Sequence, residues 1–300
     1  MTAPGASSPP DALYAGAPVD RSAYPFQSRW LAVSAGRMHY VDEGRGEPVL
    51  LIHGTPTWSF EWRHQVQALR ERYRVVAPDH LGFGLSERTR DFSYTPEAHA
   101  QNLGAFVDRL GLERFTLVVH DYGGPIALPL CWHRTARVTR LAIVNSWMWS
   151  LRGDKGLELQ GRLAGSRWFR FLYRRLNFSL RVIMPHAYGD RGKLTAAIHR
   201  QYLERFPDAW SRGAVLWALA KAMLGSDAYY QSLWERRDAL KGRPTLLIWG
   251  LKDPAFGAQL GRWRSVLPDA EVLELPEVGH WPQEEEPERV SQALLEFLRR

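Results

Sequence analysis

The chain has 300 residues, of which 45% are hydrophobic and 24% are charged, and it contains one cysteine. These values exclude a disordered or low-complexity chain, a disulfide framework and a metal site built from several thiolates. No apolar stretch approaches the roughly 18–20 residues that cross a membrane, and the first residues lack the basic and apolar segments of a secretory signal. We therefore expect a cytoplasmic protein with no membrane span.

The net charge of +7 is unevenly distributed along the chain. Residues 151–240 contain 16 Lys and Arg against 8 Asp and Glu, so the remaining residues sum to −1. A basic excess raises nucleic acid as a partner, but here the excess belongs to one stretch of arginines with a helical pattern. We expect a solvated helical face and no nucleic-acid partner. The alternative is a surface that attracts anionic substrates or an acidic partner.

Residues 1–23 are rich in Pro, Ala, Gly and Ser and predict a flexible tail, followed by apolar side chains at 24–26. Short apolar runs then alternate with helical patterns. The runs predict strands at 30–34, 38–42, 49–52, 75–77, 116–119 and 141–144, and the helical patterns lie at 60–69, 96–110 and 124–133. This alternation predicts a mostly parallel sheet with helices on both faces.

The strand signal stops at residue 147, and the next part of the chain resembles a series of amphipathic helices. Strands return at 245–249 and 272–275, before a closing helix at 289–298. A helical block inserted between strands of one sheet is most simply a cap over the carboxyl edge, where ligands bind in open α/β sheets. We therefore predict a core of 24–146 plus 240–300, with a helical cap at 147–239.

The segment 118–124 follows a buried strand and opens a helix, which is the setting of a nucleophile elbow. The usual pattern is G-x-S-x-G. In this chain Asp121 holds the nucleophile position, Val119 replaces the first glycine, and Gly123 and Gly124 keep the following backbone small. The predicted nucleophile is therefore a carboxylate rather than a hydroxyl.

An acid and a base follow in the order that such sites require. Asp253 comes directly after the strand at 245–249, and His280 lies in the loop after the last strand. Each residue alone has an ordinary structural explanation, but three correctly typed residues at three strand ends indicate a catalytic triad. After the strand at 49–52, His53 and Gly54 permit a sharp turn, so the main-chain N–H groups of Thr55 and Tyr122 are the predicted oxyanion donors.

The segments 53–59, 119–124, 249–256 and 279–280 together resemble the α/β-hydrolase superfamily, and within it the haloalkane dehalogenase group. This resemblance implies an eight-stranded, mostly parallel sheet with helices on both faces and an inserted helical cap. In these dehalogenases the residue after the nucleophile is normally Trp, whose indole N–H helps to hold the departing halide. This sequence has Tyr122 there, and it has Thr55 where a second donor, Asn, often stands.

A carboxylate nucleophile determines the class of reaction. Because Asp is already ionised at neutral pH, it attacks carbon directly and leaves an aspartyl ester. His280, oriented by Asp253, then takes a proton from the water that hydrolyses this ester. The chain has no dinucleotide fingerprint and no metal-binding histidine spacing, so we predict an enzyme that uses no cofactor and no metal.

The leaving group is less well defined by the sequence. Trp147 and Trp149, just after a core strand, are candidate halide donors in place of the missing indole, and the expected substrate is small and apolar. An epoxide hydrolase is an alternative, because it would use two cap tyrosines, and the cap contains Tyr173, Tyr188, Tyr202, Tyr229 and Tyr230. A β-lactone decarboxylase-like enzyme and a non-catalytic binding protein on the same fold are further alternatives. The oligomeric state is left open.

Overall fold

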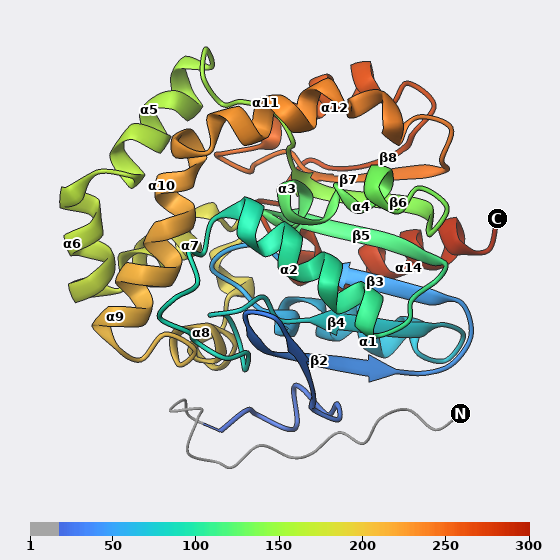
Figure 1. Cartoon of the computed structure of the whole chain (residues 1–300), viewed down its shortest axis with the longest axis horizontal. Coiled ribbons are helices and arrows are strands. Elements are labelled where there is room, and N and C mark those ends of the chain that lie inside the picture. The colour runs from blue at the N-terminus through green and yellow to red at the C-terminus, as the bar shows by residue number, and fades with distance from the viewer. Residues whose placement is uncertain (1–17) are drawn as a thin grey trace.

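The computed structural model describes residues 18–300, which form one large sheet flanked by helices (Figure 1). The strands are β1 (Arg29–Val33), β2 (Gly36–Glu43), β3 (Pro48–Ile52), β4 (Arg74–Pro78), β5 (Phe115–Asp121), β6 (Val138–Ser146), β7 (Thr245–Gly250) and β8 (Glu271–Leu275). Their order in the sheet is β1-β2-β4-β3-β5-β6-β7-β8. β2 runs antiparallel to both neighbours, and every other neighbouring pair is parallel. The predicted fold class is confirmed.

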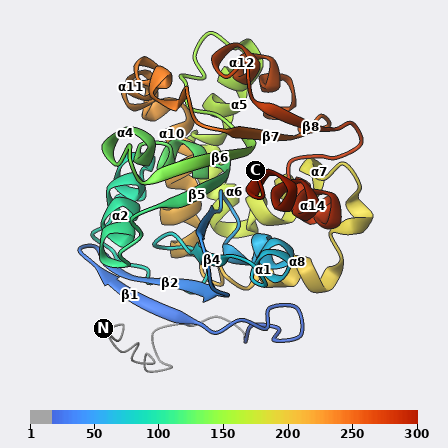
Figure 2. The same cartoon turned by 90° about the vertical axis from the view of Figure 1, so that its right-hand side faces the viewer.

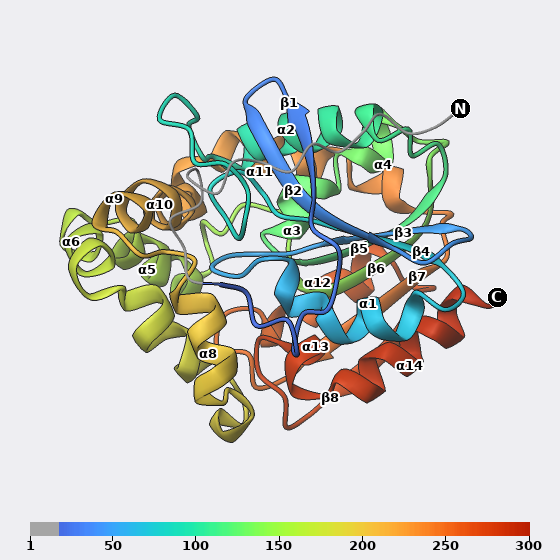
Figure 3. The same cartoon turned by 90° about the horizontal axis from the view of Figure 1, so that it is seen from below.

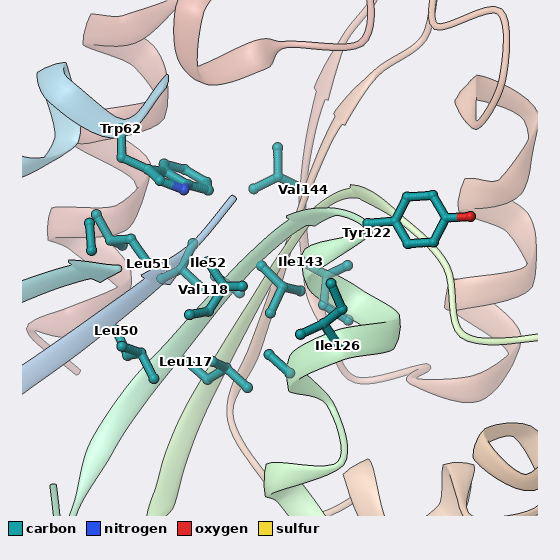
Figure 4. Close-up of a cluster of buried hydrophobic side chains, with 14 of the residues drawn as sticks. Leu50, Leu51, Ile52, Trp62, Leu117, Val118, Tyr122, Ile126, Ile143 and Val144 are labelled. Carbon is teal, nitrogen blue, oxygen red and sulfur yellow. The ribbon is translucent and has the colours of Figure 1, made fainter. Parts of the chain in front are cut away.

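The central strands are buried on both faces, as their unbroken apolar runs predict. Every residue of β5 and of β7 is buried, and so are residues 49–52 of β3. Figure 4 shows side chains of β3, β5 and β6 beside Trp62 and Ile126 of the flanking helical elements, with Tyr122 at one side of this cluster. Because the parallel strands point the same way, the loops after β3, β5, β7 and β8 all emerge at one edge of the sheet.

Helices cover both faces of the sheet. In Figure 2, α2 (Pro96–Arg109) and α4 (Leu130–His133) lie on one side, and α1 (Arg63–Leu69) and α14 (Pro287–Leu298) lie on the other. Shorter elements complete the core: η2 (Ser59–Trp62), α3 (Gly123–Ala127), η7 (Gly257–Gln259), α12 (Leu260–Val266) and α13 (Pro282–Glu285). The hydroxyl of Thr95 accepts a hydrogen bond from the Ala98 N–H at 3.3 Å, which caps the start of α2.

The prediction of one continuous helix at 124–133 is wrong. The pattern at 124–133 predicts a single helix, but the structure divides it into α3 and α4. Pro129 has no N–H to continue the helical hydrogen bonds. The Pro125 carbonyl, which such a bond would have used, accepts a hydrogen bond from the Tyr229 hydroxyl at 2.8 Å instead. A side chain from the predicted cap therefore supports the break.

All regular elements between β6 and β7 are helical, and Figures 1 and 3 both show most of them gathered at one end of the sheet, while α11 leads back alongside it. They are α5 (Lys155–Ala164), α6 (Arg167–Leu176), η3 (Ser179–Ile183), α7 (Met184–Ala187), η4 (Arg191–Lys193), α8 (Ala196–Leu203), α9 (Ala209–Ser211), η5 (Arg212–Leu216), α10 (Trp217–Gly225), α11 (Asp227–Glu235) and η6 (Arg237–Leu240). The division into a core and a cap at 147–239 stays our interpretation. Within residues 18–300, no helix is long and apolar enough to cross a bilayer.

The predicted tail at 1–23 lies mostly outside the described residues, which begin at Pro18. Just after it, Tyr24 and Phe26 are buried, and their rings make an edge-on contact with centroids 4.9 Å apart. The Tyr24 hydroxyl lies 2.5 Å from that of Ser59. The apolar side chains at 24–26 thus join the chain to the core before β1 begins.

Candidate active site

Asp121 is the last residue of β5, and α3 begins two residues later. Its φ is +48°, a left-handed conformation that is costly for a residue other than glycine and is typical of strained functional turns. The Ser146 hydroxyl donates a hydrogen bond to the Asp121 carbonyl at 2.5 Å. A Cβ atom on Gly124 would lie 2.0 Å from that same hydroxyl oxygen, so this close turn requires glycine. The local geometry is that of the predicted elbow.

The loop after β3 lies directly against the Asp121 side chain. The Thr55 N–H donates a hydrogen bond to Asp121 Oδ1 at 2.8 Å. A Cβ atom on Gly54 would lie 2.4 Å from Asp121 Oδ1, so only glycine leaves room for the carboxylate. The segment after β4 supports this loop, because the His80 N–H donates to His53 Nε2 at 3.0 Å. One predicted oxyanion donor therefore already holds the carboxylate.

His280 lies between the two aspartates. Its Nε2 is 3.5 Å from Asp121 Oδ2, and its Nδ1 is 2.7 Å from Asp253 Oδ2. All three residues are buried, with exposed fractions of 5–6%. The carboxyl ends of β5, β7 and β8 thus bring together the three residues that the sequence places in a triad.

These charges control the protonation of His280. Burial opposes the charged imidazolium, but the carboxylates of Asp253 and Asp121 outweigh it and raise the pKa of His280 to about 10. Burial likewise opposes the charge of Asp253, yet the neighbouring His280 lowers the pKa of Asp253 below its usual value. A pKa of about 10 keeps His280 protonated at neutral pH.

Asn145 is a residue of the site that the sequence analysis missed. It lies on β6, is fully buried and has a φ of +32°. Its Nδ2 donates to Asp253 Oδ2 at 2.8 Å and to the Gly250 carbonyl at 3.0 Å, while its Oδ1 accepts from the Gly250 N–H at 2.8 Å. Asn145 therefore fixes both the acid and the end of β7. Its position near a strand end was the available signal.

A second buried pair lies behind His280. His120 is fully buried, and its Nε2 is 2.8 Å from the His280 carbonyl while its Nδ1 is 3.1 Å from Glu61. The main-chain N–H of His280 donates to the Ala187 carbonyl at 2.8 Å. The base is thus held from the core side by His120 and from the helical block by Ala187.

The triad opens into a cavity of about 450 Å³ that is lined mainly by apolar side chains. Tyr122 and Trp147 line it, but the Tyr122 hydroxyl donates to the Leu219 carbonyl at 2.6 Å and is therefore already used. Trp147 stacks on Phe256 with ring centroids 4.5 Å apart, and its indole N–H is buried without a hydrogen-bond partner. The same is true of the indole N–H of Trp281, which also lines the cavity and which the sequence analysis missed.

Other predicted residues lie away from this cavity. Trp149 is not among its lining residues and packs against Trp263, with ring centroids 5.1 Å apart. Of the cap tyrosines considered for an epoxide hydrolase, Tyr173 lines the cavity and the others do not. Those others contribute to packing or hydrogen bonding elsewhere, as the Tyr229 hydroxyl does at Pro125.

An elbow, an oxyanion loop and a base at successive ends of a mostly parallel sheet define the α/β hydrolases. A family model described as the alpha/beta hydrolase fold matches residues 47–287, and this chain belongs to that family. Within the family its relatives include haloalkane dehalogenase 2 of Mycobacterium tuberculosis, which is 39% identical over 92% of this chain and 96% of that protein. The chain is therefore an enzyme of the haloalkane dehalogenase-like group.

Relatives with other names also match most of the chain. The cis-3-alkyl-4-alkyloxetan-2-one decarboxylase of Shewanella oneidensis is 32% identical over 91% of this chain and 89% of that protein. Among solved structures, haloalkane dehalogenase DbeA from Bradyrhizobium elkani superposes with a TM-score of 0.79 at 25% identity, over 90% of this chain and 96% of that one. The epoxide hydrolase CorEH superposes with a TM-score of 0.75 at 23% identity, over 91% of this chain and 99% of that one, which shows a shared fold.

Proposed function

We propose that this enzyme hydrolyses the carbon–halogen bond of small apolar haloalkanes, with Asp121 as the nucleophile. The Thr55 N–H holds Asp121 Oδ1, which leaves Oδ2 as the attacking oxygen. Oδ2 forms a bond to the carbon that carries the halogen, and the halide leaves with the electrons of the broken bond. The product of this step is an alkyl ester of Asp121 in which Oδ1 is the carbonyl oxygen.

The second step hydrolyses the ester. His280 removes a proton from a water molecule, whose oxygen attacks the carbonyl carbon of Asp121. The main-chain N–H groups of Thr55 and Tyr122 hold the oxyanion that develops on Oδ1, and one such donor typically contributes about 2.7–4 kcal/mol. The tetrahedral intermediate collapses and the alcohol leaves with the proton from His280. The Asp121 carboxyl group, which now carries one oxygen from water, passes its remaining proton to His280, and the carboxylate is restored.

The first step prepares the base for the second. The negative charge of Asp121 is one of the causes that raise the pKa of His280 to about 10. Esterification removes this charge, so the pKa of His280 falls after the halide has left. The imidazolium can then release its proton to the solvent along with the halide, and the neutral imidazole that remains acts as the base for ester hydrolysis.

The proposal rests chiefly on one observation. The carboxylate of Asp121, on the turn after β5, faces an apolar cavity whose lining also includes indole N–H groups without a partner. A halide leaving into such a cavity needs N–H or O–H donors, because the apolar walls offer it no hydrogen bonds. Trp147 and Trp281 have free indole N–H groups, whereas the Tyr122 hydroxyl is bound to Leu219. We assign halide stabilisation to Trp147, which contacts the Tyr122 ring with centroids 4.7 Å apart.

A second candidate reaction is decarboxylation of a β-lactone, which the similarity to the Shewanella protein favours. In a β-lactone the ring oxygen joins the carbonyl carbon to a saturated carbon. Attack of Asp121 on the saturated carbon would break its bond to the ring oxygen and free a carboxylate. Loss of carbon dioxide would then form an alkene and release Asp121, with no water consumed. Opening of an epoxide is less well supported, because Tyr173 is the one cap tyrosine that lines the cavity.

We further propose a cytoplasmic location and no nucleic-acid partner. The single cysteine, Cys131, is a buried free thiol whose pKa is raised by burial to about 12, and such a thiol suits a reducing compartment.

The variant His280→Gln tests the proposed mechanism, because it should allow ester formation but slow ester hydrolysis about 10²–10⁴-fold. We expect mass spectrometry of this variant with a 1-bromoalkane to show one alkyl group per chain on Asp121, with stoichiometric halide release. As a control, single turnover of the unmodified enzyme in heavy-oxygen water should put label into Asp121 and none into the alcohol. Halide release without an ester would contradict the mechanism, and alkene with carbon dioxide from a β-lactone would favour the second candidate.

A further inference from the structure

Exposed apolar side chains are concentrated on one part of the helical block. Eight large hydrophobic side chains are exposed in residues 18–300, and seven of them lie between positions 159 and 183. They are Leu159, Leu163, Trp168, Phe171, Leu176, Val182 and Ile183. Isolated exposed apolar residues are normal on a protein surface, but a gathering of this kind marks an interaction site. We call this surface, formed by α5, α6 and η3, the cap face.

Helix α6 carries the largest of these side chains. Trp168 is 66% exposed and stacks on Phe171, with ring centroids 5.7 Å apart, although both rings are open to solvent. The opposite side of the helix buries Tyr173. Figures 1 and 3 show α6 at the outer end of the helical block, with no other element beyond it. The apolar side of α6 is therefore presented outward.

The same surface is strongly basic. Residues 155–186 contain seven Lys and Arg and one acidic residue, Glu158. Among the described residues, the one ion pair formed by these cations joins Arg162 to Glu158. Arg167 and Arg175 on α6 and Arg181 on η3 are exposed. The cap face thus combines aromatic and aliphatic side chains with exposed arginines, of which Arg167, Arg175 and Arg181 form no ion pair with an acidic residue of the described chain.

The cavity opens at this surface. Leu163, Val182 and Ile183 line the cavity that contains Asp121, and the same three side chains are 37–48% exposed. A side chain that meets both the cavity and the solvent lies at the mouth of the cavity. An apolar molecule lying against the cap face would therefore be next to the route to the triad.

We propose that the cap face docks on the surface of an anionic phospholipid bilayer, from which apolar substrate enters the cavity. Trp, Phe and Leu side chains favour the boundary between headgroups and acyl chains, and arginines beside them pair with lipid phosphates. The inner leaflet of cell membranes is negatively charged, which complements the cap face. This inference goes beyond the proposed chemistry and concerns where the substrate comes from.

The charges favour a lipid surface over a second copy of this chain. In a symmetric dimer each cap face would meet its own copy, so Arg167 and Arg175 of one chain would approach the same arginines of the other. Like charges brought together in an interface cost free energy, whereas anionic headgroups neutralise them. An acidic protein would also neutralise them, and a chain that fails to bind anionic vesicles would count for that occupant and against a lipid surface.

Vesicle flotation of the full chain tests the proposal. Vesicles of phosphatidylcholine mixed with phosphatidylglycerol are compared with vesicles of phosphatidylcholine alone, at low and high salt. One variant combines W168A with F171A, and another combines R167Q, R175Q and R181Q; none of these residues lines the cavity. The matched controls are L251A, which changes the exposed apolar residue outside the cap face, and the combination R72Q, R114Q and R299Q of other exposed arginines.

We expect binding to the anionic vesicles, which high salt weakens. The aromatic variant should lower the partition coefficient by on the order of tenfold or more, and the arginine variant roughly a hundredfold, while both controls bind as the unmodified chain does. Turnover of a water-soluble substrate should not change in any variant, so a failure of the proposed chemistry would be distinguishable. No binding to anionic vesicles, or equal loss in the controls, would overturn the proposal. Self-association through the cap face in the absence of lipid would overturn it in favour of a dimer.

Discussion

The edge of the sheet differs from the cavity wall and the helical block in how far its side chains are engaged in contacts. At the sheet edge, the Asp121 carboxylate accepts from Thr55, and Asp253 accepts from Asn145, Ala255 and His280. In the cavity wall, by contrast, the indole N–H of Trp147 has no partner, and on the helical block α6 leaves aromatic rings in solvent. The reacting groups are thus held in place, while the surfaces that meet the substrate keep unused binding capacity.

This difference separates two aspects of function. The ester bond that we propose for Asp121 depends on groups supplied by the core strands and the loops that follow them, and we expect changes there to abolish chemistry. The cavity wall and the cap face determine which molecule reaches Asp121. Changes in them should therefore alter substrate preference and the rate at which substrate enters. The four predictions below examine this division, starting with the largest expected effect.

Removal of the proposed nucleophile should abolish the chemistry at the sheet edge without changing the cavity wall or the cap face. In Asp121→Asn the amide cannot form the ester, so we expect halide release to fall by at least about 10⁴-fold with little change in folding. Asp269→Asn, which changes an exposed carboxylate, is the matched control and should retain full activity. Substantial steady-state turnover by the Asp121 variant would show that another group attacks the substrate.

Removal of a single N–H in the cavity should have a smaller and more selective effect. Trp147→Phe keeps an aromatic ring on Phe256 but removes the unpartnered donor, so we expect halide release to slow about ten- to a hundredfold. The loss should appear in the formation of the ester and not in its hydrolysis, which rapid-quench kinetics separate. The control Tyr122→Phe removes a hydroxyl already bound to Leu219 and should leave halide release nearly unchanged.

Asn145 should act as a positioning residue. Asn145→Ala removes the hydrogen bonds to Asp253 and Gly250, and we expect ester hydrolysis to slow roughly tenfold and the free energy of unfolding to fall by about 1–3 kcal/mol. The pH dependence of hydrolysis should shift as well, because His280 is less well oriented. Asn177→Ala changes another buried asparagine with positive φ, and a similar kinetic loss there would contradict a specific role.

The protonation of His280 should also affect the stability of the folded protein. The expected change in stability with pH is the smallest of these effects. Its pKa is raised from the ordinary 6.5 to about 10, so the folded protein binds this proton more tightly than the unfolded chain. The resulting stabilisation is fully present below pH 6.5 and is lost as pH rises through about 10. The melting-temperature difference between the unmodified chain and His280→Gln should therefore shrink across this range. A constant difference would mean that His280 is neutral throughout.

Local signals were sufficient to predict the strands and to single out three residues that the fold brings together. Apolar runs such as 49–52 and 116–119 are short, unbroken and bounded by turn residues, so they indicate buried strands without knowledge of their neighbours. Parallel strands end at one edge, and this geometry brings Asp121, Asp253 and His280 together from positions far apart in the chain.

The rest of the site depends on contacts between distant segments. Trp147 and Trp149 follow the same strand two positions apart, and only the packing of Phe256 and Trp263 around them decides which side chain meets the cavity. Asn145 has no recognisable motif, because its role arises from Gly250 and Asp253 on the neighbouring strand and loop. The division of the helix at 124–133 likewise requires Tyr229, which lies about a hundred residues later in the chain.

The hydrogen bond from the His280 N–H to the Ala187 carbonyl restricts how this enzyme can be re-engineered. A Cβ atom on Gly279 would lie 2.1 Å from that carbonyl oxygen, so the loop and the helical block fit closely there. A chimaera that exchanged the whole block at its two junctions with the sheet would also remove the support of the imidazole. Grafts should instead keep the turn around Ala187 and replace helices on either side of it.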